Sequence, residues 1–299
     1  MIGFINVPVC NLWSNWNSPM EEDYSSLTDN FRITEWYKQL PVHMKSTKAR
    51  VRTQLLYGEP VLIDKRVGEW LYVAAKEQIT SDGPMGYPGW LPITQVEIND
   101  KYNLMVKEKQ MAMIISKTAL FQKMDGSSLE LSFMTKFPIY KEEAEFVWVC
   151  GPSLEKGKIK RSDVYIISKT EHLDFKTGLL PLLSNFSRTP FIGGGTSSFG
   201  FDCSGFVFRI YQALGIKVSR NVKDQLKEGH EISINEISPG DLLFYCTDPV
   251  DPQNVNHVGI YLGNGKFISA RRTGLPIKIS HVSEPFYAGK YHTARRYIL

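Results

Sequence analysis

The sequence predicts an α+β protein in which two small β-rich domains precede a third domain that combines a helix with a sheet. Short apolar strands separated by Gly, Pro and Asp turns fill residues 49–96 and recur over residues 107–167. Helical apolar spacing then begins at Cys203, and alternating strands follow it. A chain of 299 residues is long enough for two or three domains of this kind.

Residues 1–45 are expected to form an N-terminal arm with one helix. Between residues 30 and 40, apolar side chains that include Ile33, Trp36 and Leu40 recur at helical spacing. Pro41 should end this helix, because proline disfavours the helical conformation of the residue before it.

Residues 46–105 and 106–170 are each expected to form a small β-barrel. The strands expected in the first are Val51–Leu56, Pro60–Asp64, Trp70–Ala74 and Gly89–Pro92. Those expected in the second are Met111–Ile115, Leu129–Phe133, Glu145–Val149 and Val164–Ile167. Asp125 and Gly126 form a hairpin-turn signal within the second domain.

Residues 171–299 are expected to form the third domain. The segment Leu179–Pro190 leads into it as a helix or bridge, and Cys203–Leu214 is expected to be a helix that stops at Gly215. The strands expected after this helix are Asp241–Tyr245, Val258–Leu262 and Lys266–Ser269.

Composition narrows the class of protein more than its function. The chain is 42% hydrophobic and 22% charged, as in soluble globular proteins, and its apolar runs are too short to span a membrane. The net charge of +4 arises from 35 basic and 31 acidic residues without long basic blocks, which argues against nucleic acid. Residues 1–8 lack the pattern of a signal peptide, so a cytoplasmic location is expected, or an extracellular one if the start of the chain has been trimmed. A monomer is expected as well.

The four cysteines are scattered without paired spacing, which argues against a disulfide framework and against a zinc site. Cys10, Cys150 and Cys246 have apolar neighbours and are expected to be buried small hydrophobes. Cys203 differs because it stands where a loop turns into a helix, and the helix dipole there favours a thiolate. Its N–H could also donate to a developing oxyanion.

A thiolate nucleophile needs a proton partner, and His257 begins an alternating strand that could provide one. If the turn after this strand is 263–265, Ser269 falls on the same face as His257. A two-residue turn would place Ser269 on the opposite face. Each residue alone is often structural, but together Cys203 and His257 indicate nucleophilic catalysis by a cysteine–histidine pair.

Several motifs resemble those of the NlpC-type cell-wall peptidases. In the third domain they are Phe201-Asp202-Cys203-Ser204-Gly205-Phe206, Ser238-Pro239-Gly240-Asp241-Leu242, His257-Val258-Gly259-Ile260-Tyr261 and Gly263-Asn264-Gly265-Lys266-Phe267-Ile268. Upstream, Gln54-Leu55-Leu56-Tyr57-Gly58-Glu59-Pro60-Val61 and Gly86-Tyr87-Pro88-Gly89-Trp90-Leu91 resemble the bacterial Src-homology-type barrel found before such peptidases. The resemblance therefore extends over nearly the whole chain.

This resemblance implies a papain-like catalytic domain behind two Src-homology-type barrels, with no metal or organic cofactor. The implied activity is that of a γ-D-glutamyl-L-diamino acid endopeptidase acting on peptidoglycan stem peptides or muropeptides with a free N-terminal L-alanine. The implied catalytic residues are Cys203, His257 and Ser269. The implied substrate-binding residues are Glu59, Tyr87, Asp202, Ser204, Arg220 and Asn221. Of these, Glu59 and Tyr87 would read the substrate amine.

The chain departs from the family pattern around the implied active site. Ser269 stands where a histidine, asparagine or glutamine usually orients the base, and Phe191 stands where many relatives have a tyrosine. Gly193 replaces a common tryptophan, and Asn221 replaces the acid expected to bind the substrate amine. These changes are expected to slow the reaction or to alter its specificity.

Two alternatives stay open from the sequence. The third domain could be a degenerate peptidase that only binds muropeptides, or an acyltransferase that passes the same thioester to an amine. The sequence also leaves open whether the diamino acid is diaminopimelate or lysine.

Overall fold

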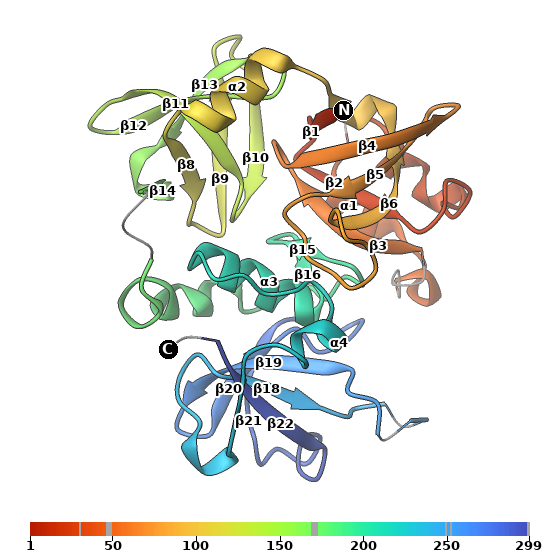
Figure 1. The fold of residues 1–299 in the computed structure, drawn as a ribbon, viewed down its shortest axis with the longest axis vertical. Coiled ribbons are helices and arrows are strands. Elements are labelled where there is room, and N and C mark those ends of the chain that lie inside the picture. The colour runs from red at the N-terminus through yellow and green to blue at the C-terminus, as the bar shows by residue number, and fades with distance from the viewer. Residues whose placement is uncertain (30, 46–49, 169–172, 249, 252, 298–299) are drawn as a thin grey trace. The chain divides into compact units, whose positions relative to one another are not determined.

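The computed structural model describes residues 1–29, 31–45, 50–168, 173–248, 250–251 and 253–297 (Figure 1). The chain divides into two units. The first comprises Met1–Gln78, Asp82–Glu171 and Ser197–Phe199, and the second comprises Ile79–Ser81, His172–Thr196 and Gly200–Leu299. No helix in the described parts of the chain is long and apolar enough to cross a membrane.

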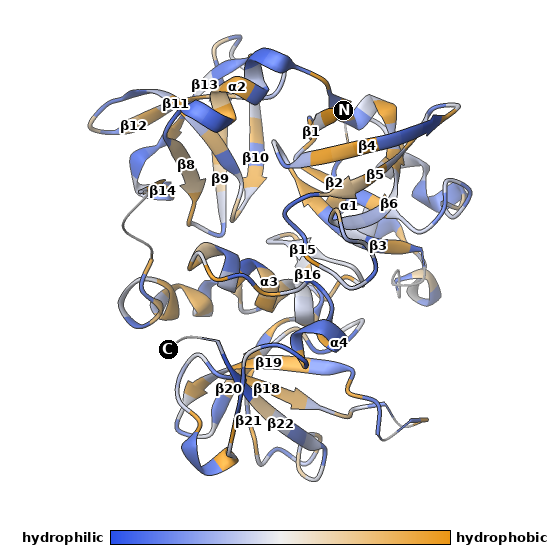
Figure 2. Ribbon diagram, viewed as in Figure 1, coloured by the Kyte–Doolittle hydropathy of each residue, from blue (hydrophilic) through white to orange (hydrophobic). Residues whose placement is uncertain are grey.

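The first unit begins with a seven-stranded antiparallel sheet in the order β3-β2-β6-β5-β4-β1-β7. Its strands are β1 (Ile2–Ile5), β2 (Val9–Trp13), β3 (Val51–Leu56), β4 (Pro60–Val67), β5 (Trp70–Ala75), β6 (Tyr87–Pro92) and β7 (Val96–Glu97). All four strands expected in this region are confirmed. β4 runs from apolar to charged residues because its second half leaves the core (Figure 2).

The prediction of a separate arm over residues 1–45 is wrong. Its helix is confirmed as α1 (Ile33–Gln39), but β1 and β2 are strands of the first sheet. Both strands are almost wholly buried, with polar Asn11 among the buried residues. They therefore lack the alternation of apolar and polar residues by which strands are recognised in a sequence.

A second seven-stranded sheet follows in the same unit, in the order β10-β9-β13-β12-β11-β8-β14. Its strands are β8 (Met111–Ile114), β9 (Thr118–Lys123), β10 (Ser128–Ser132), β11 (Lys136–Glu142), β12 (Phe146–Cys150), β13 (Lys156–Lys160) and β14 (Val164–Ile167). The predicted turn at Asp125 and Gly126 is confirmed between β9 and β10. The sequence prediction missed α2 (Asp100–Glu108), β9, β11 and the Lys-rich β13, whose alternate side chains face solvent.

Short helical segments complete the first unit. They are η1 (Glu21–Leu27), η2 (Val42–Met44), η4 (Ile93–Gln95) and η5 (Arg161–Asp163). Each of the two sheets has its own cluster of buried apolar side chains. The expected order of two β-rich regions before a mixed region is therefore confirmed.

The second unit combines helices with a six-stranded antiparallel sheet in the order β17-β22-β18-β19-β20-β21, drawn in blue in Figure 1. Its strands are β17 (His230–Ile232), β18 (Leu242–Tyr245), β19 (His257–Gly263), β20 (Lys266–Ser269), β21 (Lys278–His281) and β22 (Tyr291–Arg296). The helical segments are η6 (Phe175–Leu179), η7 (Leu180–Phe186), α3 (Cys203–Ala213), α4 (Val222–Gln225) and η8 (Ile234–Glu236). A short strand pair, β15 (Thr196–Ser197) and β16 (Gly200–Phe201), precedes α3.

The hairpin between β19 and β20 corrects one detail of the prediction. Gly263 pairs with Lys266, so the turn is Asn264-Gly265 alone, and both residues have positive φ angles of 52° and 70°. This is the backbone of a type I′ turn. A bulge between Tyr261 and Gly263 then shifts the register by one residue, and Ile260 pairs with Ile268. A two-residue turn alone would have put Ser269 on the face opposite His257. The bulge shifts the register by one residue and returns Ser269 to the same face.

Candidate active site

Cys203 is the first residue of α3, and Asp202 caps that helix. The Asp202 backbone is extended, and its Oδ1 accepts a hydrogen bond from the Gly205 N–H at 2.6 Å. Such a cap satisfies one of the backbone donors that a helix leaves unpaired at its start. Cys203 is partly exposed, and the positive end of the helix dipole favours a negative charge at its position.

Asp202 also forms a buried ion pair with Arg220. The Arg220 Nη1 lies 3.0 Å from Oδ1, and Nη2 lies 2.8 Å from Oδ2. Arg220 Nη1 donates a second bond to Ser204 Oγ at 3.0 Å, and the Gly194 N–H donates to Asp202 Oδ2 at 3.0 Å. The structure thus brings together three residues predicted to bind substrate, and their mutual bonds fix the loop and helix start around Cys203.

His257 is buried at the start of β19, and α3 lies against this strand. The Cys203 thiol points to the backbone of the preceding residue, with Sγ 3.9 Å from the Asn256 carbonyl oxygen. The Asn256 side chain is fixed by Thr247, whose N–H and hydroxyl both donate to its Oδ1. The residue predicted as nucleophile therefore contacts the backbone next to the residue predicted as base.

Ser269 contacts the predicted base directly. Its Oγ lies 3.1 Å from His257 Nε2, and both side chains are buried. The Tyr287 ring stacks on the imidazole with centroids 5.9 Å apart and an interplanar angle of 26°. Tyr245 lies on the ring as well, at 6.2 Å between centroids. Ser269 and the two tyrosines hold the imidazole in one orientation.

The surroundings of His257 favour its neutral form. Burial lowers the pKa of His257 to about 3, and the positive charge of Arg271 acts in the same direction. A neutral imidazole has one protonated and one free nitrogen. At neutral pH one ring nitrogen of His257 is therefore unprotonated, as a proton acceptor requires.

This pKa predicts an acid-sensitive fold. In the unfolded chain His257 titrates near 6.5, so between about pH 6.5 and pH 3 the unfolded state binds more protons. The stabilisation is complete above pH 6.5 and is lost as the pH falls toward 3, by about 1.4 kcal/mol for each pH unit. Urea unfolding at pH 7, 5 and 4 should show a smaller decline for His257→Gln than for the unmodified protein. Equal declines in both proteins would contradict the assigned pKa.

Asn221 lies beside a segment that no sequence motif marks as part of the site. Its Nδ2 donates to Thr80 Oγ1 at 3.1 Å, and Asp224 Oδ2 accepts from the Ser81 N–H at 3.1 Å. Residues 79–81 belong to the same unit as α4. The Asp224 carboxylate thus lies one helical turn after Asn221, and it accepts a hydrogen bond from the Ser81 backbone.

Glu59 and Tyr87 belong to the first unit. Glu59 is 8% exposed, and its Oε2 accepts from the Leu56 N–H at 3.1 Å across the turn between β3 and β4. Tyr87 is 4% exposed, and the Arg52 guanidinium lies 5.3 Å from its ring centroid. Their role toward substrate stays a prediction.

The structure also places Phe191 and Gly193, two of the residues at which the chain departs from the family pattern. Phe191 forms an isolated parallel bridge with Phe201, next to the loop that carries Asp202. Gly193 is buried in the segment between Phe191 and β15. Of the other cysteines, Cys10 and Cys150 are buried as predicted, whereas the prediction for Cys246 is wrong because it is partly exposed at the end of β18.

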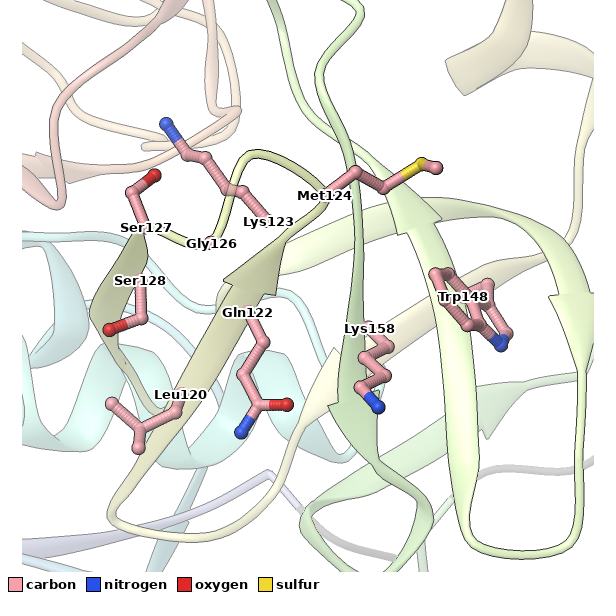
Figure 3. A pocket seen from close by; sticks show the side chains of 9 residues that line it. All are labelled: Leu120, Gln122, Lys123, Met124, Gly126, Ser127, Ser128, Trp148 and Lys158. Atoms are coloured by element: carbon pink, nitrogen blue, oxygen red, sulfur yellow. The ribbon is translucent and has the colours of Figure 1, made fainter.

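A hollow on the second sheet of the first unit is unsuited to the same chemistry (Figure 3). It is lined by Leu120, Gln122, Lys123, Met124, Gly126, Ser127, Ser128, Trp148 and Lys158. No cysteine, histidine or carboxylate is among these residues. The sulfur and imidazole of the second unit therefore remain the candidate active site.

Comparison with known proteins agrees with this geometry. The family model described as "NlpC/P60 family" matches residues 188–296, which include Cys203, His257 and Ser269. A gamma-D-glutamyl-L-lysine dipeptidyl-peptidase of Bacillus subtilis (strain 168) is 31% identical over 300 residues, covering 96% of each chain. The chain belongs to the NlpC/P60 family.

Two further relatives extend the similarity within the family. A gamma-D-glutamyl-L-lysine dipeptidyl-peptidase of Bacillus cereus (strain ATCC 10987 / NRS 248) is 29% identical, over 99% of this chain and 90% of the relative. The crystal structure of an NlpC/P60 family protein from Bacillus cereus ATCC 10987 superposes with a TM-score of 0.92 at 28% identity, covering 99% of both chains. The similarity therefore includes both β-rich regions as well as the C-terminal domain.

Sequence reasoning missed several residues around the imidazole, above all Tyr287 and Arg271. Neither belongs to a motif near Cys203 or His257, and both are brought there by the segments that follow β20. The only signal in the sequence is the aromatic pair Phe286-Tyr287, which reads as ordinary core. Their contribution is visible only from the tertiary structure.

Proposed function

We propose that this chain is a cysteine peptidase that hydrolyses the γ-D-glutamyl-L-lysine bond of peptidoglycan stem peptides with a free N-terminal L-alanine. The two relatives that align over nearly the full chain are both named gamma-D-glutamyl-L-lysine dipeptidyl-peptidase. The site supplies the groups such a reaction needs: a thiol at a helix start, an uncharged imidazole and a hydroxyl that orients it.

One observation supports the proposal most strongly. The Cys203 thiol contacts the carbonyl of Asn256 while the next residue, His257, has its Nε2 engaged by Ser269. If Nε2 donates its proton to Ser269, Nδ1 bears the lone pair and is left for the thiol. As an acceptor for Nε2–H, Ser269 would do what a third catalytic residue does elsewhere, which is to hold the ring in this tautomer.

The proposed reaction proceeds in two halves. Cys203 Sγ attacks the γ-carbonyl carbon of the D-glutamyl residue as His257 Nδ1 takes the thiol proton. The C–N bond then breaks, and His257 returns the proton to the leaving α-amine of lysine. Water next attacks the thioester with His257 again as base, which releases L-Ala-D-Glu and regenerates the thiol.

The test is mass spectrometry of L-Ala-γ-D-Glu-L-Lys after incubation with the protein. We expect release of L-Ala-D-Glu and lysine, and at least about tenfold slower release from the N-acetylated peptide, because the free amine is part of what is recognised. An intact peptide after prolonged incubation would contradict the proposal and favour a protein that binds muropeptides without turnover. A dipeptide joined to an added amine would instead identify an acyltransferase.

We also propose that the two seven-stranded sheets of the first unit are closed barrels of the bacterial Src-homology type. Their antiparallel order and separate cores support this, as do the Gln54–Val61 and Gly86–Leu91 segments that resemble such barrels. Closure would leave no strand edge open to pairing with another chain.

A further inference from the structure

Arg271 lies close to the proposed base, although nothing in the reaction above uses it. It follows β20 two residues after Ser269, and its Cζ lies 3.2 Å from the ring centroid of Phe286. The same atom lies 5.8 Å from the ring centroid of Tyr287, which in turn stacks on His257. Arginine, tyrosine and histidine thus form one continuous group on the His257 side of the site.

The guanidinium of Arg271 has no acid to neutralise it among the residues that the structure describes. Three other arginines of this unit do have one, since Arg220 pairs with Asp202, Arg295 with Glu231 and Arg296 with Asp241. Within the same described residues, the Arg271 Nε is buried without a hydrogen-bond acceptor, while the side chain as a whole is partly exposed. A buried donor left unsatisfied costs free energy, which an incoming acceptor would recover.

An arginine in this state is suited to a carboxylate. Its planar fork of N–H groups matches the two oxygens of a carboxylate, and its stacking on Phe286 fixes the plane of that fork. The positive charge of Arg271 also opposes protonation of His257 and lowers its pKa. A bound carboxylate would offset this charge and make the imidazole a stronger base when substrate is present.

The chemistry of the proposed substrate indicates which of its carboxylates would reach Arg271. His257 must deliver its proton to the nitrogen of the leaving lysine, so the leaving residue lies on the His257 side of the bond. The α-carboxylate of that lysine is attached to the carbon that bears this nitrogen, and it is free when lysine ends the peptide. The D-glutamyl α-carboxylate belongs to the acyl part, which stays on Cys203.

We propose that Arg271 binds the α-carboxylate of the leaving diamino acid and so makes the enzyme prefer stem peptides that end at that residue. This inference rests on the proposed function and adds a specificity determinant to it.

The test compares kcat/KM for L-Ala-γ-D-Glu-L-Lys and for the same peptide with a C-terminal carboxamide. The unmodified enzyme should prefer the free acid by about tenfold or more, the range expected for a charge-assisted hydrogen bond. Arg271→Gln should abolish this preference by slowing only the acid, and Arg271→Lys should retain part of it. Lys278→Gln is the matched control, because Lys278 is a neighbouring cation already paired with Glu284, and it should keep the full preference.

Equal rates for acid and amide in the unmodified enzyme would overturn the inference, as would an unchanged preference in both Arg271 variants. A third peptide with D-isoglutamine in place of D-glutamate separates the two carboxylates. If Arg271→Gln instead abolishes discrimination against that peptide, Arg271 reads the acyl part and the inference is wrong.

Failure of the proposed function would look different. If the unmodified enzyme cleaves none of these peptides, binding to the Cys203→Ala variant by calorimetry still tests Arg271. The acid should bind at least about tenfold more tightly than the amide, and adding Arg271→Gln should remove the difference. Equal dissociation constants would overturn the inference.

Discussion

Cys203→Ala should lower kcat/KM for L-Ala-γ-D-Glu-L-Lys by on the order of 10⁴ or more, because it removes the atom that forms the thioester. The fold should be retained, since the side chain is small and partly exposed and the helix cap belongs to Asp202. The measurement is steady-state release of lysine, with circular dichroism to verify folding.

Cys246→Ala is the control for Cys203→Ala. Cys246 is also a partly exposed cysteine of the second unit, and the proposed reaction gives it no role. Its replacement should leave kcat/KM within about twofold of the unmodified enzyme. Hydrolysis that survives Cys203→Ala but not Cys246→Ala would move the nucleophile to the other thiol.

The second large effect is expected from His257→Gln, with a loss of about 10³ in kcat or more. Glutamine is close to histidine in size and can still bond to Ser269, so the variant removes the proton acceptor more than it disturbs packing. KM should change little, because the proposed binding groups are left in place. Initial rates over a range of peptide concentrations separate these two parameters.

His281→Gln provides the comparison for this variant. His281 ends β21 in the same sheet, is exposed and bonds to Ser283, so its replacement should leave kcat unchanged. A His257→Gln enzyme that keeps more than about a tenth of the unmodified kcat would show that another group accepts the proton.

Local chemistry explains why the sequence predicted the start of α3 and the strand that begins at His257 but not the side chains that pack around them. Asp202 before Cys203 is a helix cap that can be read from residue types alone, and the strand from His257 alternates visibly. By contrast, the ion pair of Asp202 with Arg220 joins distant segments, and no periodicity in either segment announces it. The same holds for the stack of Tyr287 on His257.

The hairpin between β19 and β20 shows how a correct conclusion can follow from a wrong intermediate. The sequence prediction needs a three-residue turn to bring Ser269 beside His257, whereas the structure uses Asn264-Gly265 and a bulge before Gly263. Either route adds one residue to one strand, so the side chains face the same way. Turn residues indicate that a hairpin exists, but the position of a bulge depends on packing that the sequence does not display.

In the first sheet, by contrast, the sequence led to a wrong prediction. The prediction of an arm fails at β1 and β2 because their residues are buried without alternation, and they pair with strands that lie much later in the chain. Strands of this kind are recognised from the strands that they pair with. The sequence near β1 and β2 does not show which strands those are.

The central claim is that Cys203 gives its proton to His257, and the most direct test is the rate at which iodoacetamide alkylates Cys203 at about pH 6.5, well below the ordinary pKa of a cysteine thiol. Peptide mass mapping would follow Cys203 in the unmodified enzyme and in His257→Gln, with Cys246 as the internal reference. The claim predicts that Cys203 reacts at least about tenfold faster when His257 is present, while Cys246 reacts equally in both proteins. Equal rates for Cys203 in the two proteins would contradict it.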